Sequence, residues 1–89
     1  MYHLLFSTAA SDQLKRLDKP TAQRILTKLK WLAEHFDEVE PETLSAAWQD
    51  YFKLRVGSYR AIYTADRGEL AITVHLVGHR REIYKRPGS

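Results

Sequence analysis

The sequence of 89 residues contains no cysteine, a single methionine and no long apolar run. Without cysteine the chain can form neither disulfide bonds nor thiolate-bound metal sites. Its apolar stretches fall far short of the ~20 residues that a membrane-spanning helix needs. The opening residues, MYHLLFSTAA, lack the basic segment and the apolar length of a signal peptide, so we expect a cytoplasmic protein with no membrane partner.

The length of the chain limits the size of its core. Chains of this size bury only about 60 to 65% of the surface that they expose when unfolded. We therefore expect a single domain over residues 1–89, with a thin core and no separate cofactor-binding domain. No spacing of His and carboxylate residues fits a metal site, and no glycine-rich phosphate-binding loop is present, so we expect no cofactor.

Positive and negative charges are separated along the sequence. Residues 1–33 carry six Lys or Arg and two Asp or Glu (+4), residues 34–50 carry six acidic residues and no Lys or Arg (−6), and residues 51–89 carry eight basic and three acidic residues (+5). These sum to the net charge of +3. A basic C-terminal half points to a polyanionic partner such as nucleic acid, but an ordinary solvated surface has a similar composition about half the time.

The first half of the sequence predicts a strand followed by two helices. The short apolar stretch YHLLF predicts a strand over residues 2–6, and Ser7 and Thr8 are suited to cap a helix that ends near residue 17. Pro20 lies just inside the start of a second helix. Apolar residues then recur at helical spacing: Ala22, Ile25, Leu26, Leu29, Leu32, Ala33 and Phe36. The acidic stretch DEVEPETLSA has no sustained period, which predicts a loop.

The second half changes to a period of two, which predicts three strands at about residues 51–56, 59–66 and 69–77. The intervening GS and RG pairs are typical of tight hairpin turns. Gly57, at the first position of a two-residue loop, suits a type II′ turn that needs a positive φ. Counting back from the turns places Arg60 opposite Arg55 on one side and opposite His75 on the other.

These registers divide the strands into an apolar face and a basic face. The apolar face would carry Phe52, Leu54, Val56, Tyr59, Ala61, Tyr63, Leu70, Ile72, Val74 and Leu76. The basic face would carry Tyr51, Lys53, Arg55, Arg60, Ile62, Thr73 and His75. We therefore predict an α+β fold in the order β-α-α-β-β-β, with the two-helix hairpin packed on one face of an antiparallel sheet and the basic face open.

The predicted basic face has the chemistry of a surface for single-stranded RNA. Arginine binds phosphate through its planar fork, lysine acts as a point charge, and tyrosine offers a ring to a base. Two like charges directly across a hairpin, such as Arg55 and Arg60, destabilise it unless an anion lies close by. Nothing in the sequence has the pattern of a helix-turn-helix or zinc module.

The stretches YFKLRVGSYRAIY and VHLVGHRREIYKR resemble the RelE/ParE superfamily of bacterial toxins through the motifs K-x-R-x-G-x-Y-R and V-G-x-R-x-E-x-Y. The resemblance covers nearly the whole chain and favours the RelE branch. It implies a ribosome-dependent mRNA endoribonuclease acting in the ribosomal A site on message. It also implies a cognate antitoxin, with the toxin–antitoxin complex binding operator DNA through the antitoxin.

The resemblance also implies roles for individual residues. The catalytic set is Lys53, Arg60, Arg80 and Tyr84. The chemistry of the basic face and of the GHRREIY stretch adds the residues expected to bind RNA, which are Tyr51, Arg55, His75, His79 and Arg81. In the expected reaction a ribose 2′-OH attacks the adjacent phosphate, which needs a base, cations around the phosphorane and an acid at the 5′-oxygen.

The identity of the base and of the acid stays open at this point. Lys53 is a candidate base or an electrostatic stabiliser, and Arg80 a phosphate clamp that assists the leaving group. Tyr51 stands where RelE-type toxins often carry a second lysine, so His75 and His79 are candidate substitutes in proton transfer. The expected site contains no metal.

Two other functions are compatible with the sequence. A ParE-like protein would inhibit DNA gyrase through a protein interface and cleave nothing, and an inactive relative would only bind its antitoxin. A second feature lies on the long helix, where Trp31 shares one face with Arg24, Lys28 and His35. That stripe is either a partner surface or a tryptophan partly covered by lysine side chains.

Overall fold

The computed structural model describes residues 1–83, so Tyr84 of the expected catalytic set lies outside the described residues. The strands are β1 (His3–Phe6), β2 (Glu42–Ser45), β3 (Trp48–Val56), β4 (Tyr59–Asp66) and β5 (Ala71–His79). The helices are α1 (Thr8–Arg16), α2 (Lys19–His35), the 3-10 turn η1 (Phe36–Glu38) and the short α3 (Arg80–Ile83). The α+β prediction is confirmed.

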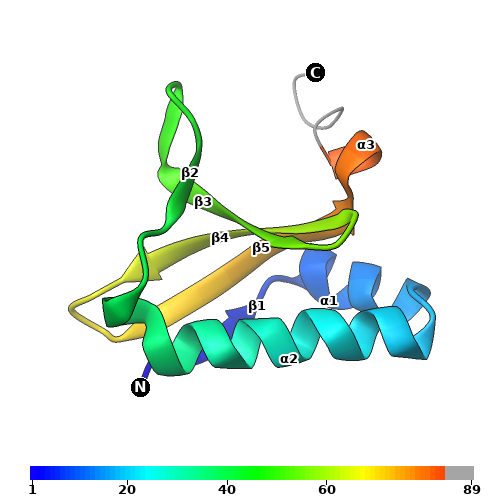
Figure 1. The fold of residues 1–89 in the computed structure, drawn as a ribbon, viewed down its shortest axis with the longest axis horizontal. Coiled ribbons are helices and arrows are strands. Elements are labelled where there is room, and N and C mark those ends of the chain that lie inside the picture. Colours follow the sequence, from blue (N-terminus) through cyan, green and yellow to red (C-terminus); the bar gives the residue numbers. More distant parts are fainter. Residues whose placement is uncertain (84–89) are drawn as a thin grey trace.

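The five strands form one sheet in the order β1-β5-β4-β3-β2. Helices α1 and α2 cover one face of this sheet, while α3 and the far end of the β2–β3 hairpin rise on the other side (Figure 1). Four strands are antiparallel, but β1 lies parallel to β5, with His3 paired to Ala71 and Phe6 to Val74. The first strand thus joins the sheet beside the last, a pairing that the local sequence pattern does not specify.

Side chains that precede each long helix define where it begins. The Ser7 hydroxyl accepts a hydrogen bond from the Ala10 amide at 3.0 Å, and the Asp18 carboxylate accepts one from the Thr21 amide at 3.1 Å. These bonds satisfy amides that have no partner within the helix. Pro20 lies in the first turn of α2, where it removes no helical hydrogen bond. Both helix starts are therefore where the sequence predicts them.

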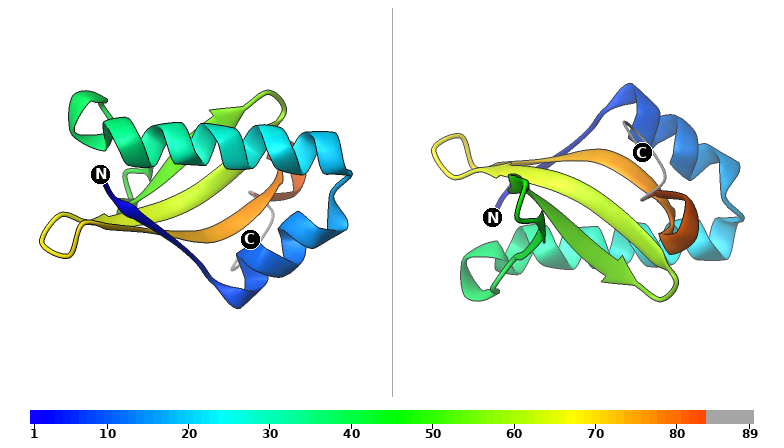
Figure 2. Two further views of the ribbon diagram at one scale, coloured as in Figure 1. Left: turned by 90° about the horizontal axis from the view of Figure 1, so that it is seen from below. Right: turned by 90° about the horizontal axis from the view of Figure 1, so that it is seen from above.

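Helices α1 and α2 lie across one face of the sheet (Figure 2, left), and the core lies between them and the sheet. Its fully buried large side chains are Tyr63, Phe36, Ile25, Leu29, Ile72, Val74 and Val77. The predicted β3–β4 register is confirmed from Val56↔Tyr59 to Phe52↔Tyr63. Gly57 has φ of +59°, as the predicted tight turn requires.

The predicted β4–β5 register is wrong in two respects. Asp66 pairs with Ala71, so residues 67–70 form the loop in place of a two-residue turn. Asp66 stabilises this wider loop by accepting the Glu69 amide at 3.0 Å. Leu70, expected in the core, lies in the loop with φ of +54° and is 44% exposed.

The second difference is a β-bulge at His75. Ile62 pairs with Leu76 and Tyr63 pairs with Val74, so His75 is an extra residue in β5. An extra residue exchanges the two faces of a strand beyond it. Val77 therefore lies in the core, and Leu76, which was expected there, lies on the opposite face beside Ile62.

The acidic stretch predicted as a loop contains β2, and β3 begins at Trp48 instead of residue 51. Strand β2 is an edge strand of four mostly exposed residues. It lacks an alternating apolar pattern because neither of its faces is buried, and only its pairing with β3 makes it a strand.

The fold makes a prediction about core packing. Replacing the fully buried Ile72 with alanine should lower the free energy of unfolding by about 2 to 5 kcal/mol, because it leaves a cavity between the sheet and the helices. The same shortening at Leu70 should change it by less than about 0.5 kcal/mol, since that side chain is exposed. Urea unfolding of both variants measures the difference; equal losses would contradict this register.

Candidate functional site

The open face of the sheet is the face opposite α1 and α2. It lies between the β2–β3 hairpin on one side and α3 on the other (Figure 2, right). Strand β3 contributes Tyr51, Lys53 and Arg55, and β5 contributes His75. The structure thus brings four of the predicted site residues onto one surface.

A carboxylate that the sequence analysis missed lies among these cations. Glu42 pairs with Lys53 across β2 and β3. Its carboxylate accepts two hydrogen bonds from Arg55, from Nε at 3.1 Å and from Nη2 at 2.7 Å. Lys53 Nζ lies 3.4 Å from the same carboxylate. Residues 34–50 contain six acidic residues, and no sequence pattern singles out Glu42 among them, because its position depends on the pairing of β2.

The electrostatics of this cluster fix the charge of the carboxylate. The hydrogen bonds from Arg55, together with the positive charges of Arg55 and Lys53, lower the pKa of Glu42 below its ordinary value. Glu42 is therefore ionised at neutral pH. Lys53 is mostly shielded, with a side chain 18% exposed, whereas the Glu42 side chain is 45% exposed and can reach a ligand.

Arg60 has a different environment from the one predicted. It lies opposite Arg55, but its residue is only 9% exposed. Its Nη1 donates to the carbonyls of Gly57 and Tyr59, both at 2.8 Å. Its predicted exposure on an open basic face is therefore wrong. The two arginines avoid each other because one binds a carboxylate and the other binds the carbonyls of the turn.

The bulge in β5 also changes which residues lie beside Arg60. Gly78, and not His75, is its partner. A Cβ atom at Gly78 would lie 3.9 Å from Cβ of Ile83, a residue of α3 that is 5% exposed. The Arg80 amide donates to the Ser58 carbonyl at 2.8 Å. Helix α3 is therefore held against the sheet beside the β3–β4 turn.

The last strand and α3 place the remaining predicted residues at the border of the open face. Arg80 and Arg81 are exposed on α3. His79 pairs with Tyr59, and the centroids of their rings are 5.5 Å apart. Tyr59 packs against the core, so His79 shares the helix side of the sheet and does not join Lys53. The Arg81 amide donates to His79 Nδ1 at 3.1 Å.

His75 and Tyr51 lie together near the middle of the open face. Their ring centroids are 5.4 Å apart, and His75 Nε2 forms a 2.9 Å hydrogen bond with the Thr64 hydroxyl. Burial lowers the pKa of His75 below its ordinary value of 6.5. The imidazole is therefore neutral at pH 7, and its contribution to this face is a ring and not a charge.

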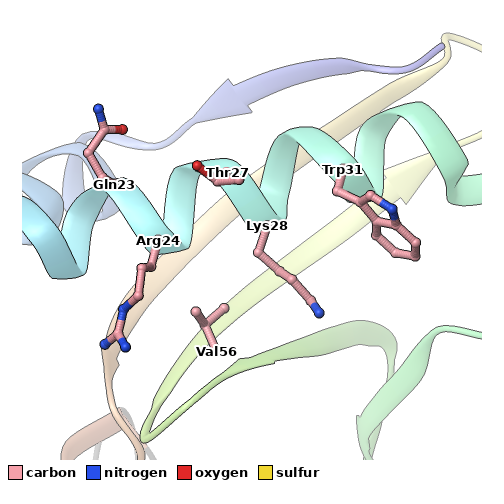
Figure 3. A pocket seen from close by; sticks show the side chains of 6 residues that line it. All are labelled: Gln23, Arg24, Thr27, Lys28, Trp31 and Val56. Carbon is pink, nitrogen blue, oxygen red and sulfur yellow. The ribbon is translucent and has the colours of Figure 1, made fainter.

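On the far side of the sheet, Trp31 lines a groove of about 440 Å³ along α2 (Figure 3). Lys28 Nζ lies 5.7 Å from the Trp31 ring, and His35 stacks on it with centroids 4.7 Å apart. Arg24 and Val56 complete the apolar and basic lining. The description as a tryptophan partly covered by lysine fits, because Lys28 flanks the ring, which is still 44% exposed. The role as a partner surface stays a prediction.

Within residues 1–83, no three His, Asp or Glu side chains are grouped closely enough to hold a metal ion. In the same part of the chain, no helix is both long and apolar enough to cross a membrane.

Comparison with known proteins places the chain in a family. Residues 4–84 match the family model described as the ParE toxin of type II toxin-antitoxin system, parDE. The chain belongs to the ParE toxin family. No curated protein matches the sequence.

Several solved toxin structures are similar to this toxin. The isolated E. coli RelE toxin is 22% identical with a TM-score of 0.76, over 96% of this chain and 93% of that one. The RelBE2 toxin–antitoxin complex of Mycobacterium tuberculosis contains a chain 24% identical with a TM-score of 0.77, over 89% and 98%. The YoeB of the Staphylococcus aureus dimer is 22% identical with a TM-score of 0.71, over 88% of this chain and 95% of that one. The RelE-like fold is confirmed.

The environment of Arg60 predicts a structural role for this side chain in the toxin. Arg60→Ala should lower the free energy of unfolding by about 1 to 3 kcal/mol, because two turn carbonyls lose their donor. Arg80→Ala removes an exposed side chain and should cost less than about 0.5 kcal/mol. Urea unfolding compares the two; a stable Arg60→Ala protein would show that the turn does not depend on this guanidinium.

The lowered pKa of His75 predicts a pH dependence of stability. As the pH falls, His75 of the unfolded chain is protonated before His75 of the folded toxin. The contribution of the neutral His75 to the free energy of unfolding is therefore complete above pH 6.5 and is lost as the pH falls below it. Urea unfolding at about pH 7.5 and about pH 5.5, above the range where carboxylates titrate, should show the loss. His75→Gln should reduce it, while His3→Gln, at an exposed residue, should not.

Proposed function

We propose that the toxin is a ribosome-dependent mRNA endoribonuclease whose active site is the open face of the sheet. The observation that carries the proposal is the cluster of Glu42 with Lys53 and Arg55. It combines an ionised carboxylate, able to accept a proton, with two cations able to stabilise a phosphorane.

In the proposed reaction Glu42 is the general base. It accepts the proton of the ribose 2′-OH while the 2′-oxygen attacks the adjacent phosphorus, and the bond from phosphorus to the 5′-oxygen breaks. A proton donor supplies the 5′-oxygen, which leaves a 2′,3′-cyclic phosphate and a 5′-hydroxyl. An incoming phosphate competes with Glu42 for the Arg55 guanidinium, so binding itself releases the carboxylate from its double hydrogen bond.

The other expected catalytic residues take roles around this centre. Lys53, beside the carboxylate, acts as a cation toward the phosphorane and not as the base. Arg80, exposed on α3, would hold a neighbouring phosphate. Arg60 keeps the β3–β4 turn in shape. Arg80 assists the 5′-oxygen as it leaves, and Tyr84 stacks on a base or orients the nucleophile.

The proposal includes partners that match those of similar proteins. The M. tuberculosis match is a toxin–antitoxin complex, and further similar structures contain RelE bound to RelB. We infer a cognate antitoxin for this toxin, with operator DNA bound through the antitoxin. The toxin would act in the cytoplasm on message in the ribosomal A site, where the ribosome holds the RNA in a reactive geometry.

Cleavage on programmed ribosomes tests this function. Glu42→Gln should lower the single-turnover rate by about 10²- to 10⁴-fold, the usual contribution of general base catalysis. The matched control is Glu38→Gln, an exposed acid of η1 outside the site, which should keep the wild-type rate. Cleavage should continue with a chelator present, because the cations of the proposed mechanism are side chains.

The same assay can also contradict the proposed mechanism, through a modified message and through naked RNA. Message with a single 2′-deoxy substitution at the scissile nucleotide should not be cut there, since the nucleophile is missing. Normal cutting at that nucleotide would eliminate the 2′-OH mechanism, and equal cutting of naked RNA would eliminate the ribosome requirement.

The match to the ParE family favours a second candidate, inhibition of DNA gyrase through a protein interface. A supercoiling assay with purified gyrase distinguishes the two functions. Inhibited supercoiling together with intact message on ribosomes would establish the second candidate in place of the first.

A further inference from the structure

Three aromatic rings follow one another from the far end of the β2–β3 hairpin to the middle of the open face. Trp48 contacts Tyr51, with ring centroids 5.6 Å apart and an interplanar angle of 79°. Tyr51 contacts His75, with centroids 5.4 Å apart and an angle of 59°. The three side chains come from two strands and form a continuous aromatic strip.

Two irregularities of the sheet create this strip. In β5 the bulge inserts His75 as an extra residue between the pairs of Val74 and Leu76. In the hairpin the register shifts between Thr43 and Ser45, so that three residues of β3, 49–51, lie against one residue of β2. Bulges bend strands and redirect side chains, and the hairpin does bend away from α1 and α2 (Figure 1).

The strip becomes more exposed toward its outer end. His75 is held inside by its hydrogen bond to Thr64, and Tyr51 is half-buried. Trp48 is 53% exposed. The steep angle between Trp48 and Tyr51 is that of an edge-to-face contact, which covers less of the two rings than a parallel stack would.

The surroundings of the strip identify what it would bind. Lys53 follows Tyr51 by two residues on the same face of β3, and Glu42 and Arg55 lie beside it. Rings beside backbone-binding cations are the arrangement by which proteins bind single-stranded nucleic acid, because every base offers a π-face. The neutral imidazole of His75 extends the rings without adding charge.

We propose that Trp48, with Tyr51 and His75 behind it, is the subsite that stacks an unpaired nucleobase of the RNA next to the scissile phosphate. The inference rests on the proposed endoribonuclease function and extends it. Trp48 is a positioning residue, because it holds the bound RNA so that the ribose 2′-OH lies beside Glu42. It also favours the bases that stack best on its ring.

Binding of a single-stranded RNA oligonucleotide with a 2′-deoxy scissile nucleotide tests the subsite directly. Trp31→Phe leaves Trp48 as the single tryptophan, since the chain has two. In that variant the RNA should quench the tryptophan fluorescence. Trp48→Ala should weaken binding by about tenfold or more, the scale of one base–aromatic stack, whereas Trp48→Phe should keep most of it.

A matched control and an altered probe make the test specific. Trp31→Ala removes the other exposed tryptophan and should bind RNA as the wild type does. An oligonucleotide with one abasic position at the stacked base should bind wild type and Trp48→Ala equally. On ribosomes Trp48→Ala should raise the message concentration for half-maximal cleavage and weaken the preference among codons.

The outcomes separate the two proposals. Unchanged RNA binding and codon preference in Trp48→Ala, with message still cleaved, would overturn the subsite and leave the endoribonuclease intact. A wild type that neither binds RNA nor cleaves message would overturn both. Loss of antitoxin binding in Trp48→Ala, with RNA binding unchanged, would assign the strip to a protein partner and also overturn the inference.

Discussion

The composition of both faces of this toxin depends on one extra residue in β5. Because His75 is inserted between Val74 and Leu76, the side chains beyond it exchange faces, so Val77 reaches the core. The bulge lies where β1 has ended, and α1 supplies partners for the local backbone. Ser7 Oγ donates to the His75 carbonyl at 2.9 Å, and the Gln13 side-chain oxygen accepts the Val77 amide at 2.6 Å. The start of α1 and the open face are thus fixed by the same few hydrogen bonds.

Acidic and basic residues that are separate in the sequence lie beside each other on neighbouring strands of the sheet. The most acidic segment, residues 34–50, folds beside the strand that carries Lys53 and Arg55. Glu42 bridges these two cations, and Arg60 is withdrawn into the turn. The open face is therefore less cationic than a count of Lys and Arg suggests. It contains an acid among bases and is therefore not a purely cationic patch.

The sequence predicted elements wherever a local signal is strong. Helix α2 has a long apolar stripe and a capping residue, and the first hairpin has Gly57 at the position that needs positive φ. The second hairpin was misplaced because Leu70, not a glycine, adopts the left-handed conformation. The bulge was missed because Leu76 and Val77 are both apolar, so the sequence does not show which of them reaches the core. Glu42 was missed for a related reason: β2 becomes a strand only through its partner, so the site depends on contacts that local pattern cannot show.

The parallel pairing of β1 with β5 has a consequence for the synthesis of this chain. Ser7, at the end of β1, is hydrogen-bonded to a residue 68 positions later. Contacts between such distant residues form late, because the loop between them must first be closed. During translation β1 has to wait until β5 has been made, and α1 lacks its hydrogen-bonding partners on the sheet for the same period. Until β5 has been made, a growing polypeptide therefore has neither the complete sheet nor the complete open face.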